Sequence, residues 1–175
     1  MIRFPDLARM FTAARVRRWH TNPVLSDTSD HLDGHQGRVA RIILALHPDP
    51  SAELLACALT HDDGEWAIGD WATPIKSRLK TTAPRLLEII ERDEREGRIE
   101  VWGERVVRWE RALTDDDREW LVFADKLDAL MWCAFHNPVL FGKAEWPAAR
   151  AWVHGRAADL GIGEQVHRYL KGAGQ

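Results

Sequence analysis

Several ionisable side chains of this sequence fall on stripes of residues that a helix would bury. His35 is spaced with Val39 as on one helical face, and His61 and Asp62 continue the face of Ala58. A histidine or carboxylate that enters a core needs a partner, because burying an unpaired polar group costs free energy. A hydrogen-bonded pair inside the core would satisfy this requirement without any function, and it is the commoner outcome for a lone buried histidine.

Asp125 and Asp128 give the strongest indication of chemistry. They share a predicted helical stripe with Leu121 and Trp132. Two carboxylates on a buried face are costly unless a cation or strong donors meet them. Imidazole nitrogen and carboxylate oxygen together suit a divalent transition metal. The candidate ligands, contributed by three separate segments, are His35, His61, Asp62 and Asp125.

His31 offers an alternative, because it precedes His35 by four residues. Two histidines at this spacing lie on one helical face and could hold a metal by themselves.

The pattern around these residues is helical nearly throughout, with a loop at Thr21–Thr28 and a less defined segment at Glu100–Leu113. No run of alternating β-branched residues indicates a strand. The sequence predicts one all-α domain over residues 1–175. The expected helices are Pro5–Trp19, Ser29–Leu46, one that Ser51 caps and that carries Leu54, Leu55 and Ala58, Thr73–Lys80, Pro84–Gly97, Thr114–His136 and Pro147–Gly161.

Composition limits the classes of function. The 175 residues are 45% hydrophobic and carry a net charge of -3, which is typical of a globular protein and argues against a general nucleic-acid binder. The longest apolar run, Ala129–Phe135, is too short to cross a membrane. Cys57 and Cys133 fall inside helical patterns and indicate buried free thiols in a reducing compartment, so a cytoplasmic location is expected.

The order H…HD…D resembles that of the HD-domain phosphohydrolases. Residues 34–40 (GHQGRVA) resemble the family's EHSxxVA helix, residues 56–62 (ACALTHD) its AlxHD segment, and residues 123–130 (FADKLDAL) its ADKLdAL segment. The resemblance implies a compact helical bundle in which the four candidate residues hold a divalent metal: Zn²⁺, Co²⁺ or Mn²⁺, with Mg²⁺ as a candidate second ion.

One branch of that superfamily fits best, over about residues 15–136. Residues 61–65 (HDDGE) and 69–76 (GDWATPIK) are similar to the HDxxE…GDxxTPxK run of bacterial 5′-deoxynucleotidases of the YfbR type, and Arg18-Trp19 resembles that branch's Arg-Trp pair. Gly34 stands where the branch has an acidic residue, and the loop between Trp19 and His35 differs. In these departures and in its short length, the sequence resembles the phage dATP triphosphohydrolases of the DatZ type.

The resemblance also implies roles for residues around the metal. Glu65 would act on the attacking water, and Asp128 would support the site from behind a ligand or lie beside that water. Arg18 would bind the phosphate next to the cleaved bond, Trp19 would form a wall for sugar and base, and Asp70 would accept a hydrogen bond from the sugar 3′-hydroxyl. Without the resemblance, Glu65 and Asp70 are ordinary loop carboxylates and Arg18 a basic helix end.

Lys76 and Lys80 are spaced to share one helical face beside this site, where they could hold the outer phosphates of a triphosphate. A solvated basic face is the equal alternative.

The expected function is therefore a metal-dependent deoxynucleotide phosphohydrolase, with dATP triphosphohydrolase activity preferred. The alternatives are a 5′-deoxynucleotidase that acts on deoxynucleoside monophosphates and, from another class, a non-catalytic nucleotide-sensing protein. A homo-oligomer, either dimer or hexamer, is the expected assembly, with no nucleic-acid or membrane partner. If the chain is phage-encoded, its location would be the host cytoplasm.

Overall fold

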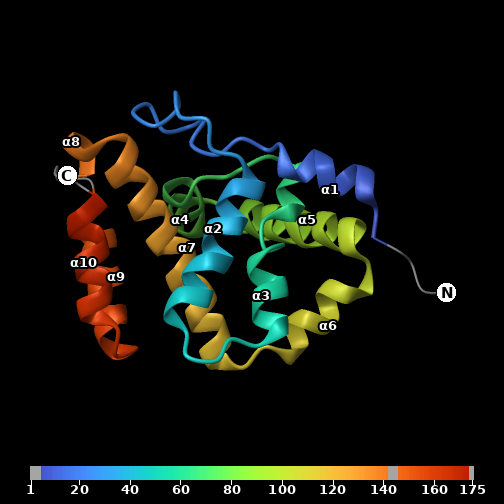
Figure 1. Ribbon diagram of the computed structural model, residues 1–175. Helices are drawn as coiled ribbons and strands as arrows, with labels where there is room; N and C mark the ends of the chain where they lie inside the picture. The colour runs from blue at the N-terminus through green and yellow to red at the C-terminus, as the bar shows by residue number, and fades with distance from the viewer. Residues whose placement is uncertain (1–4, 142–145, 174–175) are drawn as a thin grey trace.

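The computed structural model describes residues 5–141 and 146–173, and within these ranges the fold is all-α (Figure 1). The only β-type pairing among the described residues is an isolated bridge between Arg17 and His31. The elements in chain order are α1 (Leu7–Ala14), α2 (Leu32–Leu46), α3 (Ala52–Ala58), the short 3₁₀ helix η1 (Asp63–Trp66), α4 (Thr73–Thr82), α5 (Pro84–Trp102), α6 (Glu104–Ala112), α7 (Asp115–His136), α8 (Pro138–Phe141), α9 (Pro147–Asp159) and α10 (Gly163–Ala173).

Local sequence signals set several helix starts. The Ser51 hydroxyl accepts a hydrogen bond from the Leu54 backbone N–H at 3.0 Å, and Thr114 and Asp117 form a reciprocal capping box at the start of α7. Pro84 and Pro147 occupy the first turns of α5 and α9, where the missing N–H costs nothing. These starts agree with the sequence prediction because capping depends on neighbouring residues alone.

The main core lies where α2, α3 and α7 meet, with α9 and α10 against the other side of α7 (Figure 1). Its fully buried side chains include Ile43 of α2, Leu54 of α3 and Phe123 of α7. Val153 of α9 and Val166 of α10 are also fully buried, so the two C-terminal helices belong to the same core. This packing fixes α2 and α7, which carry His35 and Asp125.

A backbone contact between η1 and α5 holds the next part of the site. A methyl group on Gly64 would lie 1.8 Å from the Glu94 carbonyl oxygen, and one on Gly97 would lie 2.7 Å from the Gly64 carbonyl oxygen. Only glycine allows this approach. The Trp66 indole N–H donates to the Gly97 carbonyl at 3.0 Å and closes the contact. Glu65 is therefore held on a fixed turn.

The prediction that the first helix reaches Trp19 is wrong: α1 ends at Ala14. The following residues instead run beside the segment before α2, where the Arg18 N–H donates to the Asp30 carbonyl at 3.0 Å and the Leu32 N–H donates to the Val16 carbonyl at 3.1 Å. Partners distant in sequence thus replace the helical hydrogen bonds.

Several other boundaries differ from the sequence prediction. The helix expected from Ser29 begins at Leu32, the one expected to end at Gly97 continues to Trp102, and the last predicted helix ends at Asp159 rather than Gly161. The helix α4 begins at Thr73 itself, with Ala72 as the preceding cap residue, and continues to Thr82. Within the segment Glu100–Leu113 the structure forms a separate helix, α6, after Gly103 at a φ of 63°. The helices α8 and α10 were not predicted.

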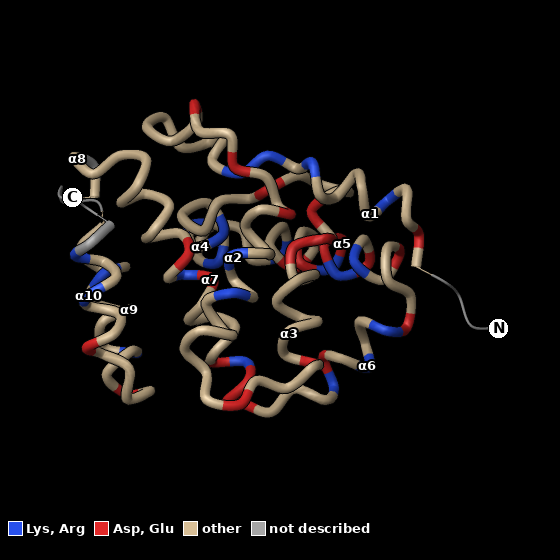
Figure 2. Tube along the Cα trace, viewed as in Figure 1, with Lys and Arg blue, Asp and Glu red and all other residues tan. Residues whose placement is uncertain are grey.

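Acidic and basic residues are interspersed along the chain (Figure 2). Across the part of the chain that the structure describes, we find no helix with the length and apolar character that a membrane crossing requires. Cys57 and Cys133 are free and buried, as predicted.

Candidate metal centre and adjoining cavity

Four predicted ligand side chains meet between α2, the turn that follows α3, and α7. Nε2 of His35 lies 3.2 Å from Nε2 of His61, 3.4 Å from Oδ2 of Asp62 and 3.2 Å from Oδ1 of Asp125. One potential ligand atom from each of His35, His61 and Asp62 lies within 4.8 Å of the other two. The Asp125 carboxylate approaches this group on the side of His35. His31, the alternative partner of His35, is exposed and precedes α2.

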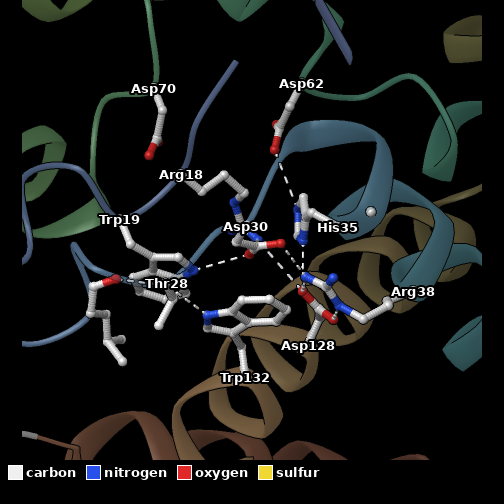
Figure 3. A network of polar contacts seen from close by, with 12 residues as sticks. Arg18, Trp19, Thr28, Asp30, His35, Arg38, Asp62, Asp70, Asp128 and Trp132 are labelled. Carbon is white, nitrogen blue, oxygen red and sulfur yellow. Dashed lines mark hydrogen bonds and ion pairs between the residues drawn. The ribbon is translucent and has the colours of Figure 1, made fainter. Parts of the chain in front are cut away.

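Hydrogen bonds at the far sides of both imidazole rings leave their Nε2 atoms available as ligands. The Ala58 carbonyl can only accept, so Nδ1 of His61, 2.9 Å away, carries the proton. Nδ1 of His35 lies 2.7 Å from Oδ2 of Asp128, which fixes the same form in that ring (Figure 3). Two lone pairs facing each other at 3.2 Å repel unless a proton or a metal ion lies between them. This group of nitrogen and carboxylate oxygen atoms could therefore hold a metal ion.

The electrostatics of the site require a positive charge. Burial would lower the pKa of His35, but hydrogen bonds with Asp125, Asp128 and Asp62 raise it to about 11. Burial would likewise raise the pKa of Asp62, but the neighbouring His61 and His35 hold it well below its usual range. Without a metal, a proton on His35 supplies the charge; a divalent cation at the same place would supply it instead.

A buried network behind His35 was not predicted from the sequence. Asp30 is 1% exposed and accepts hydrogen bonds from Nη2 of Arg38 at 2.8 Å and from the Trp19 indole at 3.0 Å. Arg38 also donates from Nε to Oδ1 of Asp128 at 2.6 Å (Figure 3). The spacing of Arg38 from His35 could have indicated a shared helical face. Nothing local could have indicated Asp30, because its partners come from two other segments: Arg18 and Trp19 before it, and Arg38 on α2.

Asp128 lies behind His35, in a position compatible with the supporting role that the resemblance implied. Only 2% of its side chain is exposed, and it contacts His35, Arg38 and, at 3.5 Å, Nη1 of Arg18. It lies behind His35 and is not among the residues that line the cavity described next. Of its two proposed roles, the geometry fits support of a ligand rather than contact with water.

A cavity of about 770 Å³ opens beside the candidate metal centre, within the size range of small-molecule sites. Asp62 and Asp125 keep 26% and 37% of their side chains exposed, so an ion bound there would be accessible from the cavity. Tryptophan side chains from distant segments form much of its wall: Trp19, Trp71, Trp146 and Trp152. The last two come from the C-terminal region, for which the sequence indicated no role. The predicted site residues that line the cavity are Arg18, Trp19, Asp62, Glu65, Asp70, Lys76 and Asp125.

Glu65 lines the cavity with a buried carboxylate that has an unsatisfied oxygen atom. The residue is 6% exposed, and Oε2 has no hydrogen-bond partner among the described residues. Burial, with the neighbouring charges of Asp62 and Asp70, raises its pKa well above the usual value. A buried carboxylate that accepts a proton readily and faces a cavity can serve as a general base.

Trp19 and Asp70 form another part of the cavity wall. Trp19 has a φ of 64°, a left-handed conformation that is rare for a bulky residue. Burial raises the pKa of the Asp70 carboxyl, although Arg18 and the Trp19 backbone oppose the shift. Gly69, at a φ of 80°, turns the chain immediately before Asp70.

The two predicted phosphate-binding lysines separate in the structure. Lys76 lines the cavity and pairs with Glu94, with Nζ 2.6 Å from Oε1. Lys80 is exposed and is not among the lining residues. The shared helical face expected from their spacing therefore places one lysine, not both, at the cavity.

Comparisons with protein-family models, with curated proteins and with solved structures found no match for this chain.

Proposed function

We propose that this protein is a metal-dependent phosphohydrolase that acts on deoxynucleotides. The observation that supports this proposal is the convergence of His35, His61, Asp62 and Asp125 at one end of a cavity that also contains Arg18 and Glu65. The sequence resemblance to HD-domain phosphohydrolases supports the same activity independently of the geometry.

A bound divalent metal would polarise a phosphate and lower the pKa of a water molecule. The residues of the chain would do the rest. Glu65 would take a proton from the attacking water, since its pKa is already raised. Arg18 would bind phosphate oxygens through a guanidinium that is 13% exposed and held by Asp30 and Asp128 at 3.5 Å.

The tryptophan walls and Asp70 would orient the nucleoside. Indole faces suit a base and the apolar side of a sugar. The Asp70 carboxylate, which lines the same cavity, would accept the 3′-hydroxyl hydrogen bond. An apolar wall near the 2′ carbon would favour 2′-deoxynucleotides, and a preference of roughly 10²-fold is the scale such a wall gives.

Our preferred reaction is hydrolysis of dATP to deoxyadenosine and triphosphate. A 5′-deoxynucleotidase acting on monophosphates is the second candidate, and the lysines favour it. Lys76 is already paired with Glu94 and Lys80 lies outside the lining, so the cavity has fewer cations for outer phosphates than expected.

The deciding experiment is a panel of deoxy- and ribonucleotides as mono-, di- and triphosphates, with Zn²⁺, Co²⁺, Mn²⁺ or Mg²⁺ added and products separated by chromatography. We expect hydrolysis that depends on the metal, and triphosphate or phosphate as the product distinguishes the two candidates. Asp125→Ala should lose both metal and turnover, whereas Asp33→Ala, an exposed acid on α2, should keep both. Absence of turnover with every metal, together with nucleotide binding, would instead support the nucleotide-sensing alternative.

A further inference from the structure

A second cavity, of about 530 Å³, lies among α5, α6 and α7 and shares no lining residue with the first. Its apolar wall comes from Cys57, Val107, Leu113, Leu121 and Val122. Its charged residues are four arginines and one glutamate: Arg95, Arg98, Arg111, Arg118 and Glu110. The proposed phosphohydrolase reaction uses none of these residues.

The charge of this cavity contrasts with the chain as a whole, which carries a net charge of -3. Glu110 accepts a hydrogen bond from Nη1 of Arg98 at 2.6 Å and lies 3.9 Å from Nη2 of Arg95. Arg118 donates to the Glu110 and Leu113 backbone carbonyls. Within the described part of the chain, neither Arg118 nor Arg111 forms an ion pair. One carboxylate against four guanidinium groups leaves a local excess of positive charge.

Arg98 is the buried arginine of the cavity wall. Only 9% of its side chain is exposed, and Nη2 donates to the Thr60 hydroxyl at 3.1 Å. Its Nε is buried beside the Cys57 thiol and has no hydrogen-bond partner among the residues that the structure describes. A guanidinium with an unused donor inside a protein is costly, because hydrogen bonds to charged groups contribute more than neutral ones. Such a group in a cavity wall indicates a place for an anion.

We propose that this cavity binds a small molecule bearing a phosphate or polyphosphate group. Guanidinium groups offer paired donors that match two oxygens of one phosphate. The four arginines carry more positive charge than the single carboxylate of Glu110 compensates, so a multivalent anion fits better than a monovalent one. The apolar wall would receive the organic part of the ligand.

The test uses inorganic pyrophosphate as the probe, titrated by calorimetry into the full chain after dialysis against a chelator. Removing metal prevents pyrophosphate from simply binding the ion. The test variant is Arg95→Ala/Arg111→Ala, and the matched control is Arg92→Ala/Arg108→Ala. Arg92 and Arg95 lie on α5 with 61% and 62% of their side chains exposed, and Arg108 and Arg111 both lie exposed on α6, so each variant loses the same charge.

We expect the test variant to bind pyrophosphate at least about tenfold more weakly and the control to remain within about twofold of the original chain. Equal weakening in both variants would mean general charge attraction and would overturn the proposal. So would an unchanged affinity in the test variant, undetectable binding to the original chain, or a loss confined to Lys76→Ala, which would place the probe in the first cavity. None of these results depends on hydrolytic activity.

Discussion

Asp128 contacts Nδ1 of His35 at 2.7 Å, on the side of the ring away from the other candidate ligands. Arg38 holds the same carboxylate at 2.6 Å, so the acceptor cannot turn away without breaking an ion pair. The ring of His35 is therefore fixed in the form that presents Nε2 to His61, Asp62 and Asp125. Support of this kind makes Asp128 testable separately from the ligands.

We expect Asp128→Asn to weaken metal binding by about 10–100-fold without abolishing it, because the ligands remain but the charge that orients His35 is lost. Titration with Co²⁺, followed by absorption, measures this affinity. The control is Asp116→Asn, an acid on the same helix with 66% of its side chain exposed. Equal affinity in the two variants would show that the contact with His35 has no role in metal binding.

Glu65→Gln should keep the metal and lower turnover by about 10²–10⁴-fold, the usual contribution of a positioned base. The same variant should change the pH dependence of stability in the metal-free chain. The pKa of Glu65 is raised by burial and by Asp62 and Asp70, so above its ordinary value of 4.5 the unfolded chain loses this proton before the folded chain does. Stability then falls as pH rises toward the folded-state pKa.

Thermal melts at a series of pH values check this second effect. The series starts at about pH 4, close to the ordinary pKa of glutamate. Between Glu65→Gln and the original chain, the difference in melting temperature should grow with pH, in favour of the variant. A constant difference would contradict the raised pKa, whereas full turnover in the variant would show that Glu65 has no part in the reaction.

Lys76→Ala should raise KM for dATP by about tenfold and affect dAMP less. The reason is that Lys76 lines the cavity, where its ammonium group could bind the outer phosphates. Lys80→Ala should leave both substrates within about twofold, since Lys80 is exposed outside the lining. Steady-state kinetics with the two substrates measure the split. Equal losses for dATP and dAMP in Lys76→Ala would contradict a role in binding outer phosphates.

The sugar contact is tested best by removing each partner in turn. If Asp70 accepts a hydrogen bond from the 3′-hydroxyl, the original chain should prefer dATP over 2′,3′-dideoxyATP by about tenfold or more in kcat/KM. Asp70→Ala should reduce activity on dATP and abolish most of that preference. A preference that survives the substitution would assign the 3′-hydroxyl to another residue.

Gly64→Ala should destabilise the protein, because the added methyl group would lie 1.8 Å from the Glu94 backbone oxygen. Overpacking of this kind costs about 1–3 kcal/mol, and we expect a loss at or above the upper end of that range. The control is Gly37→Ala on α2, where a methyl group meets nothing within 4 Å and should be neutral or stabilising. Urea denaturation gives both free energies. A mild effect at Gly64 would mean that η1 can move away from α5.

The sequence alone determined the features that depend on near neighbours. The caps at Ser51 and Thr114 act within three residues, and the all-α class follows from helical periodicity. The candidate ligands were recognisable for the same reason: His35 and Asp125 stand on helical stripes, and their residue types limit the chemistry. Arg18 and Glu65 were chosen by resemblance, and the tertiary structure places both at the cavity.

Only the tertiary structure decided the features that join distant parts of the chain. His35 and Asp128 are 93 residues apart, and their contact depends on how α2 packs against α7. Pairing with the segment before α2 ends α1 at Ala14 and replaces the helix expected to Trp19. Lys80 shares a helix with Lys76, but the orientation of α4 decides which of the two reaches the cavity. Such contacts arise from the packing of whole elements, which no local pattern of residues specifies.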